Sequence, residues 1–252
     1  RRRRNRRYRR SRLTVPFRIL SFFLICGAIV AALILFFKVQ TITVAGNSRY
    51  TTEEILAVTD IEQGENLFLI NKYAVASAIT GQLPYVESVQ IRRVLPDGIV
   101  IEVQECEPVA AVIQGSDAWL ISGSGKLLER VTESQSASYV QIRGCELLLP
   151  TVAAIAQLPS DGNIAREELL SFLEVLQERG MLDQAEWIDC SDPETLVMRY
   201  AGRFDVELRY NADFNKKMRA LEEIIGYLED NETGTIILTM SDKSSFKPHA
   251  IS

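Results

Sequence analysis

Hydrophobic residues are distributed along this chain in two different ways, and the change falls near residue 38. Residues 19–37 form an uncharged stretch of nineteen residues in which only Ser21 and Gly27 depart mildly from apolar character. A helix of that length, at about 1.5 Å per residue, spans roughly 30 Å, the thickness of a bilayer hydrocarbon core. A cleaved signal peptide has an apolar region of only about 7–15 residues followed by a small-residue cleavage pattern, so we expect an uncleaved membrane anchor.

The positive charge ahead of this stretch predicts how the chain is oriented. Nine of the first twelve residues are arginines: Arg1, Arg2, Arg3, Arg4, Arg6, Arg7, Arg9, Arg10 and Arg12. Only Lys38 balances them, so the positive-inside rule places residues 1–18 in the cytoplasm and the body outside the cell membrane. An arginine-rich tail could also bind nucleic acid or anionic lipid, but we favour a topology signal. Because the numbering opens on arginine, we expect further residues upstream.

Beyond residue 38 the apolar runs become short, and residues 39–107 predict a first folded module. Apolar and polar residues alternate over residues 41–44, 89–92 and 99–104, as they do in strands that bury one face. Thr51 followed by Glu54 is a capping-box pattern that begins a short helix, and residues 72–83 form a second helix that Pro84 ends. Pro96-Asp97-Gly98 predicts a turn between the last two strands. The predicted order is β-α-α-β-β.

Residues 108–240 predict a second module that is rich in strands and contains two helices. Leucines at positions 169, 173 and 176 give residues 166–179 one apolar face, and Gly180 suits the C-terminal cap. A second helix begins after Asp213; its apolar stripe is either a coiled-coil seam or, as we favour, a face packed on the core. The predicted strands cover residues 109–113, 119–121, 127–128, 187–188, 196–200, 204–208 and 235–240. A polar tail, 241–252, completes an α+β chain with a single N-terminal transmembrane helix.

Charge excludes a general nucleic-acid binder. From Lys38 onward the chain carries 18 basic and 33 acidic residues, so this portion is strongly acidic, and we expect no nucleic-acid partner. Cys106, Cys145 and Cys190 are widely spaced single cysteines outside the anchor. Three thiols cannot all pair within one chain, and their spacing suits neither a disulfide scaffold nor a zinc site.

The residue types that catalysis needs are scarce. The single histidine, His249, has no partner pattern for a triad or a metal cluster, so we expect no catalytic, metal or cofactor site. Gly125-Lys126 lacks the flanking residues of a phosphate-binding loop. The remaining enzymatic hypothesis is a Ser–Lys pair, Ser122 or Ser124 with Lys126, which would make the protein a membrane-anchored hydrolase.

Five motifs, in order after the anchor, resemble the POTRA domain of FtsQ/DivIB cell-division proteins. They are Val44-x-Gly46-Asn47-x-x-Tyr50, Gly64-x-Asn66-Leu67-Phe68, Leu83-Pro84-Tyr85-Val86-x-Ser88-Val89, Arg92-Arg93-x-Leu95-Pro96-Asp97 and Glu105-x-x-Pro108-Val109-Ala110. The second module is similar to the β domain of the same family, although the family pattern favours a polar residue where Ile237 stands.

The resemblance implies a non-enzymatic, single-pass scaffold at the division septum. It further implies partners of the FtsL/DivIC type and, through them, the septal peptidoglycan synthases, in addition to the lipid bilayer. An export chaperone built on a POTRA domain is a weaker alternative, because neither repeated POTRA units nor a following barrel is present. We expect the closing strand to be a free edge that accepts a partner strand, which makes Thr235, Ile236, Ile237, Leu238, Thr239 and Met240 the candidate binding residues.

Overall fold

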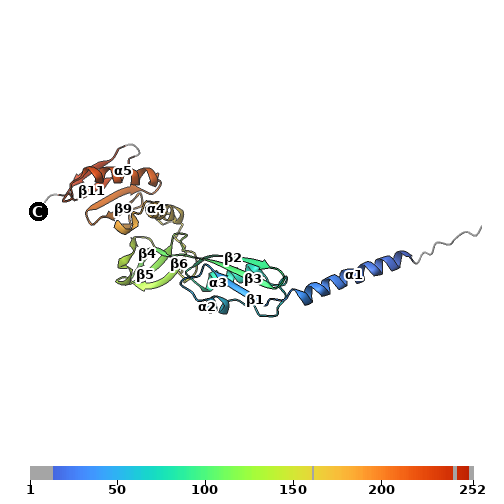
Figure 1. The fold of residues 1–252 in the computed structure, drawn as a ribbon. Helices are drawn as coiled ribbons and strands as arrows, with labels where there is room; N and C mark the ends of the chain where they lie inside the picture. The colour runs from blue at the N-terminus through green and yellow to red at the C-terminus, as the bar shows by residue number, and fades with distance from the viewer. Residues whose placement is uncertain (1–13, 161, 241–242, 250–252) are drawn as a thin grey trace, which may run out of the picture.

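The computed structural model describes residues 14–160, 162–240 and 243–249, so the arginines of residues 1–12 lie outside the described part of the chain. The molecule is elongated (Figure 1). A long helix stands at one end, a small α+β module follows it, and a larger sheet with two helices lies at the C-terminal end. This order confirms the predicted fold class.

The first helix, α1 (Thr14–Phe36), is long and apolar enough to cross a membrane. Its apolar part, Phe17–Phe36, has 20 residues and a mean hydropathy of 2.9, and it is not buried against the rest of the protein. Since a helix of about 20 residues matches the hydrocarbon core, lipid is the environment that these side chains fit.

The first module contains the predicted elements in the predicted order. They are β1 (Thr41–Ala45), α2 (Thr52–Ala57), α3 (Lys72–Gln82), β2 (Val86–Val94) and β3 (Gly98–Glu105). The sheet order is β1-β3-β2, with β1 parallel and β2 antiparallel to β3. The capping box of Thr51 and Glu54 is formed. Ile55 and Ile79, from the two helices, are buried together with Ile91 and Ile101 of the sheet, so both helices pack on the same core.

Replacing Ile91 by aspartate should destabilise this module by several kcal/mol, because an unpaired carboxylate would enter its core. Urea unfolding followed by circular dichroism measures the loss. Gln90→Asp is the matched control, since Gln90 is exposed one position earlier on the same strand. Equal midpoints for the two variants would show that Ile91 does not face the core.

The second module is built on one nine-stranded sheet. Its strands are β4 (Pro108–Gln114), β5 (Asp117–Ser122), β6 (Leu127–Thr132), β7 (Val140–Arg143), β8 (Ala185–Asp189), β9 (Thr195–Tyr200), β10 (Phe204–Arg209), β11 (Gly234–Ile237) and β12 (Ser245–Pro248). The order across the sheet is β12-β11-β10-β9-β8-β7-β4-β5-β6. Strand β7 pairs in parallel with both β4 and β8, and β10 pairs in parallel with β11. The other neighbouring strands of the sheet are antiparallel.

Helices α4 (Arg166–Glu178) and α5 (Phe214–Tyr227) supply the core of this module. Phe172 of α4 and Phe214 of α5 meet with ring centroids 4.9 Å apart. Leu169, Leu173 and Leu176 are all buried, as their spacing predicts. The apolar stripe of α5 begins with the buried Phe214, Met218 and Leu221, so it packs on the core and is not a free coiled-coil seam.

Two strands depart from the prediction. Strand β7 was not predicted, and the segment predicted as a polar tail contains β12, which pairs with β11. The predicted closing strand is therefore shorter than 235–240 and does not lie at the edge of the sheet. Both missed strands have only four residues, and in β12 the only large apolar residue is Phe246, so period-2 alternation gives too weak a signal.

Candidate functional site

The outer edge of the large sheet is formed by β12, at the end of the molecule farthest from α1 (Figure 1). The N–H of His249 donates to the Thr233 carbonyl at 2.9 Å, and the register then alternates along the antiparallel pair. Ser245 and Lys247 therefore exchange backbone hydrogen bonds with Ile237 and Thr235. The N–H and C=O of Phe246, which lies between them, point away from the sheet.

Proline at position 248 fits this arrangement. The Gly234–Pro248 pair is a non-hydrogen-bonded one, so Pro248 lacks an N–H only on the open side. The open edge of β12 thus presents one backbone donor, from Phe246, and the carbonyls of Phe246 and Pro248. An edge of this length can accept a short added strand while exposing few groups for unspecific pairing.

The side chain of Phe246 holds β12 in place. It is half-buried, and its ring lies edge-to-face with that of Phe204, with centroids 6.1 Å apart. Gly234 allows this approach, because a Cβ at that position would lie 2.6 Å from Cε2 of Phe246 and 2.9 Å from Cα of Pro248. Ser245 and Lys247 point to the other face and are exposed.

Next to the edge is a hollow of about 480 Å³ that could receive a partner side chain. It is lined by Ile237, Met240, Lys243, Ser244 and Ser245. The buried ammonium of Lys217, on α5, donates to the carbonyl of Met240, which ties the helix to the segment between β11 and β12.

The six residues predicted to bind a partner differ in their position in the sheet and in their exposure. Thr235, Ile236 and Ile237 are inside the sheet, between β10 and β12, so the edge position expected for them is wrong. Ile236 and Leu238 are fully buried, and the N–H of Leu238 donates to the Glu207 carbonyl. Thr239 is half-buried, and Met240, which lines the hollow, is the exposed member of the set.

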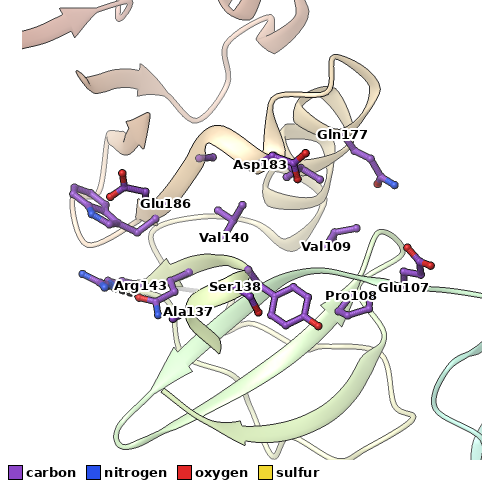
Figure 2. A pocket seen from close by; sticks show the side chains of 15 residues that line it. Glu107, Pro108, Val109, Ala137, Ser138, Val140, Arg143, Gln177, Asp183 and Glu186 are labelled. Carbon is purple, nitrogen blue, oxygen red and sulfur yellow. Dashed lines mark hydrogen bonds between the residues drawn. The ribbon is translucent and has the colours of Figure 1, made fainter. Parts of the chain in front are cut away.

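A second cavity, of about 620 Å³, lies where β4, β7 and β8 run parallel, and Figure 2 shows it. Glu107 and Gln177 lie at one end, and Arg143 and Glu186 at the other. The guanidinium of Arg143 lies 5.8 Å from the Trp187 ring centroid. The described residues that line it include no histidine, and the described part of the chain has no group of three metal-ligating side chains. This cavity offers polar contacts without an arrangement typical of catalysis.

The Ser–Lys hypothesis does not agree with the position of Lys126. Its ammonium is buried and donates to the carbonyls of Val86 at 2.6 Å, Thr80 at 2.7 Å and Leu83 at 3.4 Å, all in the POTRA-like module. Burial lowers the pKa of Lys126, but the three carbonyl acceptors favour the charged form. A lysine held in this way is a structural connection between the modules and not a free base beside Ser122.

Further contacts join the two modules around Lys126. The Tyr85 hydroxyl donates to the Glu129 carboxylate of the second module at 2.9 Å. Within the first module, the Arg49 guanidinium lies 3.5 Å from the Tyr85 ring centroid and so packs on the residue that makes this contact. Burial, together with the bond to Glu129, raises the pKa of Tyr85 to about 12, so the phenol keeps its proton at neutral pH. Tyr85 is also part of a small buried cluster with Leu120 and Leu128. The sequence offered no signal for this junction, because its hydrogen bonds join residues that are 40 or more positions apart.

Comparison with known proteins identifies the first module and finds relatives that extend beyond it. The sequence model of the POTRA domain, FtsQ-type, matches residues 37–105. The cell division protein FtsQ of Syntrophotalea carbinolica is 27% identical over 221 residues, which cover 81% of this chain and 74% of the relative. FtsQ of Corynebacterium glutamicum is 31% identical over 131 residues, covering 50% of this chain and 58% of the relative.

The DivIB branch also matches. The cell division protein DivIB of Clostridium botulinum is 31% identical over 111 residues, covering 44% of this chain and 43% of that protein. A solved extracytoplasmic domain of DivIB from Geobacillus stearothermophilus is 12% identical over 51% of this chain and 98% of that structure, with a TM-score of 0.30, and carries no weight in the assignment. The FtsQ-type POTRA match and the FtsQ relative that covers most of the chain agree with the motifs in residues 44–110: residues 37–105 are a POTRA domain of the FtsQ type, and the chain is similar over most of its length to bacterial cell-division proteins of the FtsQ/DivIB family.

Proposed function

We propose that this membrane-anchored division protein is a non-enzymatic scaffold of the divisome that binds a partner strand along β12. The observation that carries the proposal is the outward direction of the Phe246 N–H and C=O, which follows from the register of β12 on β11. A partner strand would gain main-chain hydrogen bonds there, while the neighbouring hollow at Met240 and Lys243 would select its side chains.

The family supports the choice of partner class. Bitopic proteins of the FtsL/DivIC type, with an ectodomain on the same side of the membrane, are the occupants that we propose, and through them the septal peptidoglycan synthases. The arginine-rich N-terminus supports a cytoplasmic tail and an extracytoplasmic body. A septal location belongs to the same proposal, and a fluorescent fusion imaged in dividing cells tests it.

Photo-crosslinking tests the binding edge directly. A photoreactive amino acid at Lys247, which is exposed on β12, should crosslink a membrane partner of the FtsL/DivIC type in dividing cells. The same residue at Thr132, exposed at the end of β6, is the matched control, because β6 is the opposite edge of the same sheet. Equal crosslinking from both edges, or crosslinking from β6 alone, would show that the partner does not bind at β12.

Orientation is tested independently. A reporter that works only in the cytoplasm should be active when fused to the N-terminus, and one that works only outside the membrane should be active after Ser252. Protease added to intact spheroplasts should digest the body. Full protection of the body would contradict the proposed orientation.

A further inference from the structure

The connection between α1 and the POTRA domain is short and bonded throughout. Only residues 37–40 separate α1 from β1. On one side, Leu67 N–H donates to the Phe37 carbonyl at 2.8 Å, and Val39 N–H donates to the Glu65 carbonyl at 2.9 Å. On the other side, Gln40 N–H donates to the Asp97 carbonyl at 2.9 Å. Two segments, the 64–70 loop and the tip of the β2–β3 hairpin, therefore lie against the end of the membrane helix.

Asn66 joins the loop to the helix itself. Its side-chain amide donates to two carbonyls of the last helical turn, those of Leu33 at 3.0 Å and Ile34 at 3.3 Å, and the Leu33 carbonyl also accepts the Phe37 N–H at 3.4 Å. Its side-chain oxygen accepts the Phe68 N–H at 2.9 Å, and the side chain is 9% exposed. The loop thus completes the C-terminal end of α1, which places it where the helix leaves the bilayer.

The length of α1 indicates where the helix leaves the hydrocarbon core of the bilayer. The apolar part, Phe17–Phe36, has 20 residues, and at about 1.5 Å per residue it spans roughly 30 Å, the hydrocarbon thickness. The boundary of the hydrocarbon core then falls at Phe36. The next residue, Phe37, meets Phe68 with ring centroids 5.2 Å apart, so the Phe68 ring lies at the same boundary.

Apolar side chains are exposed at this end of the domain. Among described residues 38–107, the large apolar side chains that are exposed are Phe68, Leu69, Tyr73, Val94 and Leu95. Four of them lie on the two segments that contact residues 37–40, and Leu69 and Leu95 are 73% and 59% exposed. In water such a concentration of apolar surface is unfavourable, whereas the acyl boundary of a bilayer accommodates it.

Cationic groups lie behind these apolar residues. The Arg93 guanidinium donates to the carbonyls of Leu67 at 2.7 Å and Ile70 at 2.9 Å, which holds the loop in its exposed conformation. Lys72 and Arg93 also line a cavity of about 610 Å³ between α3 and β2. Apolar side chains at the tip, with cationic groups next to them on the side of the domain body, are the arrangement that suits a membrane surface.

We infer that the POTRA domain inserts Phe68 and Leu69 of its loop and its 94–96 hairpin tip into the bilayer boundary beside α1, so that the lipid surface is a second, peripheral partner of this domain. The inference depends on α1 spanning the membrane and does not depend on partner capture at β12. The lipid boundary then covers all of these exposed apolar side chains, because they continue the apolar surface of α1 beyond Phe36.

Quenching of tryptophan by brominated acyl chains tests the insertion. Leu69→Trp and Leu95→Trp are made separately in the full chain, which is reconstituted in phosphatidylcholine vesicles with and without bromine on the acyl chains. The added fluorescence should be roughly halved or more at both positions, as expected for side chains that penetrate the boundary. Phe23→Trp, within α1, is the positive control and establishes that the helix is inserted.

Tyr227→Trp is the negative control, because Tyr227 is 89% exposed on α5 in the far module. The native Trp119 and Trp187 also lie in that module and provide a constant background. Thermal unfolding by circular dichroism shows that each variant is folded. With Phe23→Trp quenched, an unquenched signal at position 69, at position 95 or at both overturns the inference, since both segments must insert.

Discussion

Exchange of Lys126 for methionine should separate the unfolding of the POTRA domain from that of the large sheet. The change leaves the carbonyls of Thr80, Leu83 and Val86 without their shared donor, in a site where the lysine side chain is only 5% exposed. The Leu83 carbonyl still accepts the Val86 N–H at 3.1 Å, so the cost falls on the carbonyls of Thr80 and Val86. An unsatisfied buried acceptor costs about 1–3 kcal/mol, so the junction should weaken by about 2 kcal/mol or more. Thermal unfolding of the full chain in detergent micelles should change from one transition to two.

Lys243→Met is the control for this experiment, because Lys243 is exposed and lies in the far module. Amide hydrogen exchange locates the effect, with protection lost first over residues 80–86 in the Lys126 variant. A single transition at the wild-type temperature would show that the tyrosine and leucine contacts of the junction suffice without the lysine.

Gly234→Val should expel β12 from the sheet and abolish partner capture. A Cβ at this position would approach the Lys247 carbonyl, the Phe246 ring and Pro248, and each of these belongs to β12. The rest of the module should remain folded, because its core rests mainly on α4, α5 and the inner strands. Chymotrypsin cleavage after Phe246, whose ring packs on Phe204 while β12 is in place, reports release of the strand, and a membrane pull-down reports the partner.

Gly226→Ala is the matched control, since nothing lies within 4 Å of a Cβ added there on α5. A helical glycine replaced by alanine is expected to gain about 1 kcal/mol and to leave capture unchanged. Normal partner capture by a Gly234→Val variant whose β12 is cleaved would place the binding site elsewhere on the body.

Local sequence patterns predicted the POTRA domain well because its elements carry their own signals. The capping box at Thr51, the proline that ends the helix over residues 72–83 and the alternation in β2 and β3 each act within a few residues. The helices of the second module were predicted for the same reason, since Leu169, Leu173 and Leu176 mark one face.

The candidate site could not be predicted in the same way, because an edge is a property of the whole sheet. Whether β11 is the last strand depends on whether a later segment pairs with it, and β12 shows its apolar side only at Phe246. Lys126 likewise looks like a residue of a glycine-rich turn until its acceptors, which lie in the other module, are known.

The bonded connection at residues 37–40 limits which partners can reach the far end of the molecule. With α1 capped by Asn66 and held to both sides of the POTRA domain, β12 stands at a set height above the bilayer and turns with the helix. On the proposed strand pairing at β12, a partner anchored in the same membrane reaches this edge only if its own ectodomain carries the pairing segment past both modules. A stiff, extended ectodomain of matching length satisfies that requirement, whereas a short or collapsed one leaves its strand below the edge.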